Sequence, residues 1–284
     1  MGTKLSLRKN SLKNKIISII LCAGEGSRIS DFIPRKPKPL IEIDDKPILS
    51  YLIFNLIKSH TMSIMIVTGH LQDQIESYVE SIKQQDESLR NKILVINSGN
   101  EYKKGPLYSF LSITKEKNVI KNGLIYLVFP GDTYFESNLI SKLFTSISNN
   151  SSFIQNNSVI FYQKLKGNDL KNARTSNRSI SIITTEKQES KEIVKEIRQI
   201  EITSISENSY YKQIIPIFVF DSMFITDIIE TEKEVSVKTM REIINVLIKG
   251  KKKVYAFCLK PDYKFYDIDT RSDLLNLNQK KRGQ

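Results

Sequence analysis

Residues 21–28 read Leu-Cys-Ala-Gly-Glu-Gly-Ser-Arg, and residues 37–40 read Pro-Lys-Pro-Leu. The apolar run 16–21 just before them has the character of a buried parallel strand, and it leads directly into Gly24 and Gly26. Glycines let the backbone approach a ligand closely, and the N–H groups of such turns favour oxyanions. An arginine and a lysine in the same stretch add full positive charges. This stretch therefore predicts a phosphate site at the end of a strand.

Two common phosphate loops do not fit this spacing. A dinucleotide-binding loop needs a third glycine where this chain has Ile29, and a P-loop ends in Gly-Lys-Ser/Thr where this chain has Gly-Ser-Arg. The two glycines alone are equally compatible with an ordinary turn beside solvated basic residues. The presence of both Arg28 and Lys38 favours a site for the phosphates of a nucleoside triphosphate.

Carboxylates follow two further strand-like segments. Asp132 comes after an apolar run that ends in Pro-Gly, where a turn or helix-capping role is the alternative to binding a cation. Near the C-terminus, Asp267 and Asp269 point to the same side if the segment is extended, and two such carboxylates repel each other unless a cation lies between them. Thr270 is typical of a helix N-cap, with Asp273 in the first turn.

The alternation of apolar strand-like runs with amphipathic segments predicts an α/β fold with a Rossmann-like, doubly wound, mostly parallel sheet. A small antiparallel lobe is expected at roughly 150–210, inside a single domain of residues 15–284, and the basic segment 1–14 is expected to be a disordered tail. The predicted strands and helices are strands 16–21, 63–67, 92–96, 124–129, 159–165, 179–183 and 193–200, and helices 47–58, 72–83 and 107–114.

Composition narrows the functional classes. The chain has 284 residues, 40% of them hydrophobic, and a formal net charge of +12. The charge comes from scattered lysines without a recognised nucleic-acid motif, so attraction of anionic substrates is favoured over nucleic-acid binding. No run approaches membrane-spanning length, and two cysteines provide no disulfide framework. These features, together with the absence of a secretory signal, predict a cytoplasmic protein with no transmembrane segment.

The glycine stretch resembles the signature of the nucleotidyltransferase superfamily that includes sugar-1-phosphate and polyol-phosphate pyrophosphorylases. That signature is Leu-x-Ala-Gly-x-Gly-Ser/Thr-Arg, an interval, and then Pro-Lys. The matching residues are Leu21, Ala23, Gly24, Gly26, Ser27, Arg28, Pro37 and Lys38.

The resemblance implies roles for the acidic segments. In this family a Gly-Asp after the central strand holds magnesium, and Asp132 matches that aspartate. Residues 265–274 are similar to the Trp-x-Asp-Val-Asp-Thr-Pro-Glu-Asp-Leu ending of cytidylyltransferase-type members, which implies that Asp267 and Asp269 also bind Mg²⁺. A weaker similarity implies that Gly105 and Pro106 line the base pocket, with an ordinary helix start as an equal alternative.

Two departures from the family concern the acceptor. The Glu-Lys-Pro motif of sugar pyrophosphorylases is absent from 194–199, and Asp-Ile-Asp-Thr replaces their usual Asp-x-Gly-Thr. Both favour an inositol-1-phosphate or phosphocholine cytidylyltransferase type, with CTP as the donor, over a hexose-phosphate type. Lys195 and Arg198 are the candidate ligands of the acceptor phosphate.

The expected reaction is transfer of a nucleoside monophosphate from a nucleoside triphosphate to a phosphate monoester, with release of pyrophosphate. Such a monoester is largely dianionic at neutral pH because its second pKa is about 6, so no general base is required. By this resemblance Arg28 holds the departing pyrophosphate and Lys38 the α-phosphate. The alternatives are an inactive nucleotide-binding regulatory relative and, ranked lowest, a basic nucleic-acid-binding protein. The base, the acceptor and the oligomeric state are not specified by the sequence.

Overall fold

The computed structural model describes residues 15–26, 32–172 and 179–282. The predicted basic tail 1–14 lies outside these ranges, as do two predicted site residues, Ser27 and Arg28. Among the described residues, no helix is both long enough and apolar enough to cross a membrane.

The first half of the chain forms four parallel neighbouring strands in the spatial order β5-β4-β1-β6. All four match the predicted strands to within a residue, because each is a short, mainly apolar run between turn signals. They are β1 (Ile16–Cys22), β4 (Ser63–Thr68), β5 (Ile93–Asn97) and β6 (Ile125–Pro130). β1, β4 and β6 are almost wholly buried, whereas β5 is the edge strand and leaves Leu94 exposed.

The predicted helices of this half are confirmed, with one difference. The third helix ends at Leu111 instead of Thr114, and the chain tightens there into a 3-10 turn. The helices are α3 (Ile48–Lys58), α4 (Gln72–Gln85) and α5 (Pro106–Leu111). Short 3-10 turns lie at Lys38–Leu40, Glu87–Leu89, Glu101–Lys104, Ser112–Lys115 and Ile202–Ser204.

The second half of the chain extends the same sheet, which has nine strands within the described ranges and is mixed instead of mostly parallel. β11 runs antiparallel to β6 and to β8, and its pairing with β8 is interrupted around Pro216, which has no N–H to donate. The predicted antiparallel lobe therefore continues the main sheet. Its strands are β8 (Ser158–Lys166), β9 (Ser179–Gln188), β10 (Lys191–Glu201), β11 (Tyr210–Asp221) and β12 (Val254–Leu259).

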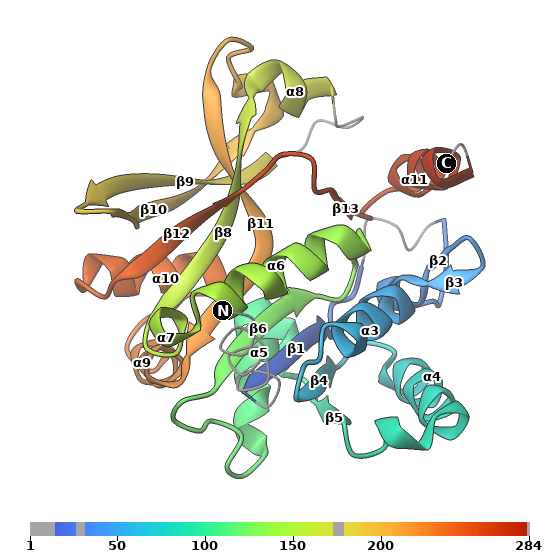
Figure 1. Ribbon diagram of the computed structural model, residues 1–284. Coiled ribbons are helices and arrows are strands. Elements are labelled where there is room, and N and C mark those ends of the chain that lie inside the picture. Colours follow the sequence, from blue (N-terminus) through green and yellow to red (C-terminus); the bar gives the residue numbers. More distant parts are fainter. Residues whose placement is uncertain (1–14, 27–31, 173–178, 283–284) are drawn as a thin grey trace, which may run out of the picture.

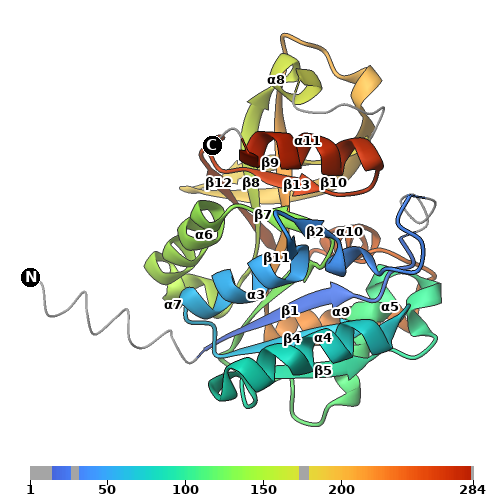
Figure 2. The same ribbon diagram turned by 90° about the vertical axis from the view of Figure 1, so that its right-hand side faces the viewer.

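Helices cover both faces of the sheet, as a doubly wound arrangement requires (Figures 1 and 2). One apolar core lies beneath α3, α4 and α6, and a second lies beneath α5, α9 and α10. Three of these helices are α6 (Ser137–Asn149), α9 (Ser222–Glu232) and α10 (Met240–Lys249). Two shorter ones, α7 (Ser151–Ile154) and α8 (Gly167–Asn172), flank β8.

A third, smaller core attaches the C-terminus to the early part of the chain. β13 (Phe265–Asp267) pairs antiparallel with β7 (Thr133–Phe135), and α11 (Arg271–Arg282) follows directly. Leu274 and Leu277 of α11 pack against the hairpin of β2 (Glu42–Ile43) and β3 (Lys46–Pro47) and against its neighbours. This packing brings the segment after β13 next to the segment after β6.

Candidate active site

The loop that follows β1 lies at the centre of one edge of the sheet. The loop after β4 donates to it through the His70 N–H to the Ala23 carbonyl at 3.1 Å, and the loop after β6 through the Gly131 N–H to the Leu21 carbonyl at 2.9 Å. The carboxyl ends of the three strands therefore meet at one edge, where ligands of open α/β sheets gather. The glycine loop and Asp132 therefore lie at the same edge of the sheet.

Gly26 has a local reason to be glycine. Its φ is +65°, in the left-handed region, and a Cβ there would lie 2.8 Å from Cγ of Lys38. A Cβ on Gly24, in contrast, would meet no atom within 4 Å. The loop is thus packed directly against the lysine at Gly26 and open at Gly24.

Gly26→Ala is expected to lower the free energy of unfolding by at least about 1 kcal/mol and to weaken nucleotide binding, because it adds backbone strain and displaces Lys38. Gly24→Ala is the matched control and is expected to unfold like the wild type. Thermal unfolding with and without a nucleoside triphosphate measures both effects. Equal stability and equal nucleotide response of the two variants would refute this role of Gly26.

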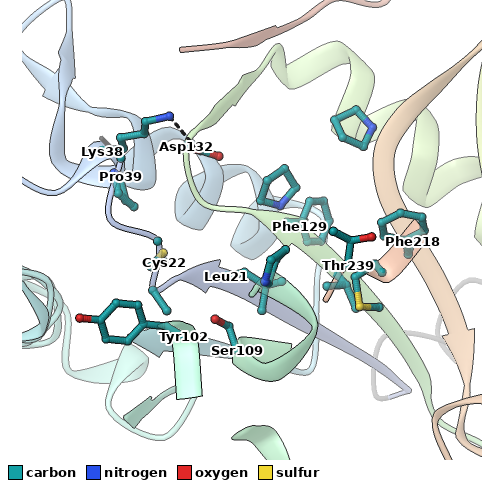
Figure 3. A pocket seen from close by; sticks show the side chains of 18 of the residues that line it. Leu21, Cys22, Lys38, Pro39, Tyr102, Ser109, Phe129, Asp132, Phe218 and Thr239 are labelled. Carbon is teal, nitrogen blue, oxygen red and sulfur yellow. Dashed lines mark hydrogen bonds and ion pairs between the residues drawn. The ribbon is translucent and has the colours of Figure 1, made fainter. Parts of the chain in front are cut away.

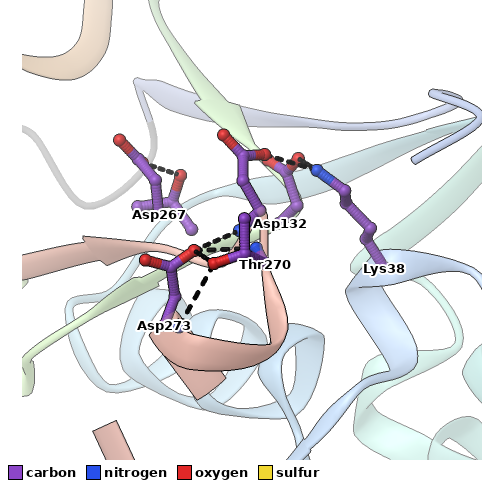
Figure 4. A network of polar contacts seen from close by, with 7 residues as sticks. Lys38, Asp132, Asp267, Thr270 and Asp273 are labelled. Atoms are coloured by element: carbon purple, nitrogen blue, oxygen red, sulfur yellow. Dashed lines mark hydrogen bonds and ion pairs between the residues drawn. The ribbon is translucent and has the colours of Figure 1, made fainter. Parts of the chain in front are cut away.

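Lys38 connects three distant parts of the chain. Its ammonium donates to Oδ1 of Asp269 at 2.5 Å and to Oδ2 of Asp132 at 3.4 Å, and only 8% of its side chain is exposed (Figure 4). The partners lie 94 and 231 residues further along the chain. Three of the predicted site residues therefore form one charged group at the edge of the sheet.

The two C-terminal aspartates have different partners. Asp269 contacts Lys38, whereas Oδ1 of Asp267 accepts a hydrogen bond from the Thr133 hydroxyl at 2.8 Å (Figure 4). The predicted N-cap is confirmed: the Thr270 hydroxyl accepts from the Asp273 N–H at 3.4 Å, and the Asp273 carboxylate accepts from the Thr270 N–H at 2.7 Å. The cap fixes where Asp269 leaves the strand and where α11 begins.

The three predicted magnesium ligands are neighbours but do not form a ready cluster. In the part of the chain that the structure describes, no three His, Cys, Asp or Glu side chains lie close enough to hold a metal ion. The ammonium of Lys38 instead lies between Asp132 and Asp269 and supplies the positive charge that two close carboxylates need. Carboxylate oxygens are the donors that Mg²⁺ prefers, so the residue types fit the ion once Lys38 moves to a phosphate.

Burial shifts the pKa values of Asp132 and Cys22 at this edge of the sheet. It raises the pKa of Asp132 above its ordinary value, and the charges of Asp267 and Asp269 raise it further, against the opposing effect of Lys38. Burial also strongly raises the pKa of the Cys22 thiol, with a smaller contribution from Asp132. The thiol of Cys22 is therefore kept protonated and is unsuited to act as a nucleophile.

A cavity of about 380 Å³ opens beside this charged group. Figure 3 shows Lys38 and Asp132 on one side of it, Tyr102 and Ser109 below, and Phe218 with Thr239 on the far side. The glycine-loop end is lined by Leu21, Ala23, Gly24, Gly26, Tyr102, Pro106 and Ser109. The far end is lined by Pro216, Phe218, Thr239, Met240 and Arg241.

Gly105, predicted to line the base pocket, is absent from the described cavity wall, whereas Pro106 lines it. Gly105 has a φ of +130°, and a Cβ there would lie 2.5 Å from the carbonyl oxygen of Lys238. That carbonyl also accepts from the Leu107 N–H at 3.0 Å. Gly105 therefore allows the start of α5 to pack against the segment before α10.

Lys195 and Arg198, the predicted acceptor ligands, are also absent from the described wall of the cavity. Both are on β10, with side chains more than half exposed, and they pair with Glu186 and Glu196 on their own hairpin. The structure does not bring them to the cavity. The cationic side chain at the far end is instead Arg241, at the beginning of α10.

Several cavity residues were not predicted from the sequence, namely Tyr102, Ser109, Pro216, Phe218, Thr239, Met240 and Arg241. One signal was available for the last three. Thr239 and Glu242 have the Ser/Thr-x-x-Glu spacing of a capping box, and both reciprocal hydrogen bonds of that box are present. The spacing predicts a helix start, although not its position beside the cavity.

The chain belongs to the Nucleotidyl transferase family, which matches residues 17–283. Among similar solved structures, a UDP-glucose pyrophosphorylase complexed with UDP-glucose aligns at 16% identity over 95% of this chain and 99% of that one, with a TM-score of 0.69. The CTP:phosphocholine cytidylyltransferase of Streptococcus pneumoniae aligns at 18% identity over 94% and 99%, with a TM-score of 0.66. At these identities the likeness concerns the fold, which is the α/β nucleotidyltransferase fold.

Sequence relatives match only part of the chain. The bifunctional protein GlmU of Methanococcus maripaludis is 30% identical over 122 residues, which are 43% of this chain and 26% of that protein. The D-glycero-alpha-D-manno-heptose 1-phosphate guanylyltransferase of Campylobacter jejuni is 32% identical over 126 residues, 44% of this chain and 51% of that protein. The matched stretch thus spans about a quarter of the first relative and about half of the second.

Proposed function

We propose that this protein transfers a nucleoside monophosphate from a nucleoside triphosphate to a phosphate monoester and releases pyrophosphate. The observation that carries the proposal is the meeting of Lys38 and Asp132, at the end of the cavity that the glycine loop lines, with Asp269 paired to Lys38 beside them. Family membership supports the same reaction class.

In this reaction an oxygen of the acceptor phosphate attacks the α-phosphorus, and the bond from that phosphorus to the β-phosphate bridging oxygen breaks. Pyrophosphate leaves with the electron pair. Because the acceptor is already ionised at neutral pH, the chain needs to supply position and charge and not a base. Burial keeps the Cys22 thiol beside the loop protonated, which fits this requirement.

Each charged residue then has a distinct task. Lys38, released from its carboxylates, neutralises charge that builds up around the α-phosphate. Asp132 and Asp269, with Asp267 beside them, would hold Mg²⁺, which when bound neutralises phosphate charge. Arg28 lies outside the described residues, and its role in holding pyrophosphate stays a prediction.

Arg241 is the residue that we assign to the acceptor. Within the described residues it forms no ion pair, and its guanidinium donates to the side-chain amide oxygen of Gln199. It borders the cavity beside Phe218 and Met240, whose apolar side chains strengthen its attraction for an anion. A cation at this end disfavours an acceptor with a quaternary ammonium group. We therefore propose a phosphate monoester with a neutral or anionic remainder, such as a sugar or inositol phosphate, over phosphocholine.

Arg241→Ala is expected to raise the KM for the acceptor by about 10- to 100-fold, because a charge-assisted hydrogen bond is lost, and to leave the KM for the triphosphate unchanged. Arg198→Ala removes an exposed arginine that is not at the cavity, and it is expected to behave like the wild type. Steady-state kinetics with each substrate varied in turn separates the two KM values. An unchanged acceptor KM in Arg241→Ala would show that another group binds the acceptor.

The donor and acceptor are identified by pairing each of the four nucleoside triphosphates with sugar-1-phosphate, inositol-1-phosphate, glycerol phosphate and phosphocholine, with pyrophosphate release as the readout. We expect release with at least one pair that contains no choline, and the preference for CTP stays a prediction from the sequence. Nucleotide-dependent thermal stabilisation without release in any pair would favour the inactive nucleotide-binding alternative.

A further inference from the structure

A second cavity, of about 460 Å³, lies away from the glycine loop. Its walls come from the ends of β8 and β11, from α8, from the segment 263–267 and from α11, all in the upper part of Figure 1. Gln213 of β11 borders this cavity. It lies on the same face of the strand as Ile215 and Ile217, two and four residues later, and these pack in the core beneath α3 and α6. Phe218, which borders the first cavity, packs with the core on the opposite face. The second cavity therefore lies on the face that α3 and α6 cover, whereas the Phe218 side of the first cavity lies on the other face.

Two buried glutamines face each other across β8 and β11 at this cavity, and they differ in their partners. Gln163 is 3% exposed, and its amide nitrogen donates to the carbonyls of Lys260 and Tyr263 at 2.9 and 2.6 Å. Gln213 is 6% exposed, and within the described residues its side chain has no hydrogen-bond partner. The amide atoms of Gln213 are not among the buried polar atoms that lack a partner, so they reach the open space of the cavity, where they can meet a ligand or water.

The remaining polar groups of the cavity indicate the kind of ligand. Asn172 borders it with Gln213, and amides both donate and accept hydrogen bonds, as the hydroxyls of a polyol do. Asp169, Asp267 and Asp273 disfavour an anion, while Lys264 and Lys280 disfavour a cation. A neutral molecule rich in hydroxyl groups satisfies all of these groups at once.

We infer that this second cavity is a binding site for a neutral polyhydroxylated small molecule, with the Gln213 amide as its central contact. The site is separate from the proposed transfer cavity. It adjoins the charged group of Lys38, Asp132 and Asp269 through two residues: Asp267 lies beside Asp132, and the Asp273 carboxylate accepts from the Asp269 N–H at 3.2 Å. The inference does not depend on the reaction assigned to the first cavity.

The test is a titration of the whole protein with myo-inositol, without nucleotide, followed through the side-chain amide signals of Gln213 in ¹H–¹⁵N spectra. These signals are assigned by their loss in Gln213→Leu. We expect a saturable shift in the wild type. Gln213→Leu is expected to bind about tenfold more weakly or worse, measured by calorimetry, since the central hydrogen bonds are missing. Gln188→Leu changes an exposed glutamine at the end of β9 and is expected to bind like the wild type.

Folding is controlled by comparing the two buried glutamines. Gln213→Leu loses no protein partner within the described residues and is expected to unfold at the wild-type temperature. Gln163→Leu removes the hydrogen bonds to the carbonyls of Lys260 and Tyr263 and is expected to unfold at a lower temperature. No shift with myo-inositol in the wild type, or equal affinity in Gln213→Leu, would overturn the inference. A stronger response to choline chloride or to inorganic phosphate would overturn the assignment of a neutral ligand. Because no turnover is measured, failure here leaves the proposed transferase reaction untouched.

Discussion

Asp132→Asn is expected to reduce pyrophosphate release by at least about 10³-fold, because the amide keeps the shape of the side chain and loses the charge that orders cations at the transferred phosphate. The fold is expected to survive this change. Burial and the neighbouring Asp267 and Asp269 already oppose the charge of Asp132, so its removal should not lower the thermal unfolding temperature. Pyrophosphate release and thermal unfolding, measured on the same preparation, separate the two effects.

The matched control is Asp262→Asn, which changes an exposed aspartate in the turn before β13. It is expected to retain wild-type activity. If Asp132→Asn released pyrophosphate as fast as the control, the carboxylate of Asp132 would have no part in the reaction.

Lys38→Gln is expected to be inactive and also less stable, with a loss of about 2 kcal/mol in the free energy of unfolding. Removing one partner of a largely buried charge group leaves Asp132 and Asp269 facing each other without a cation, and the partial exposure of both carboxylates moderates the cost. Added Mg²⁺ can then take the place of the ammonium. We therefore expect magnesium to raise the unfolding temperature of Lys38→Gln by more than that of the wild type, and EDTA to remove the difference.

The control for this variant lies two residues away. Lys36 is more exposed and pairs with Glu42 at 2.6 Å on the surface, so Lys36→Gln is expected to change stability by well under 1 kcal/mol and to show no added response to magnesium. The same response to magnesium in both variants would contradict a cation site at Asp132 and Asp269.

The strands around the glycine loop were predictable because each is a short apolar run between turn signals. β1, β4 and β6 are almost wholly buried, and β5 is the edge strand, but all four are mainly apolar runs that the local sequence is enough to identify. The mixed sheet was not predictable in the same way. The apolar run in β11 indicates a strand, but only its pairing with β6 determines that it runs antiparallel.

The sequence predicted which residues form the charged group, but it did not predict the ion pairs among them. The motifs singled out Lys38, Asp132 and Asp269, while the ion pairs among them depend on the packing of α11 against the β2–β3 hairpin. The acceptor residues were predicted less well, because Lys195 and Arg198 do not reach the cavity. The pairing of β9 with β10 shifts register between Val194 and Glu196, and such a shift changes which side chains face the core. Alternation alone therefore could not decide where Lys195 points.

The most direct measurement of the proposed reaction follows the phosphorus atoms of the donor. The wild-type protein is incubated with a phosphate monoester and a nucleoside triphosphate labelled either at the α- or at the γ-phosphorus. The proposal predicts that the α-label becomes covalently joined to the acceptor and that the γ-label appears in pyrophosphate. Appearance of the γ-label in inorganic phosphate or on the acceptor, with the α-label left in a nucleoside diphosphate, would contradict transfer at the α-phosphorus.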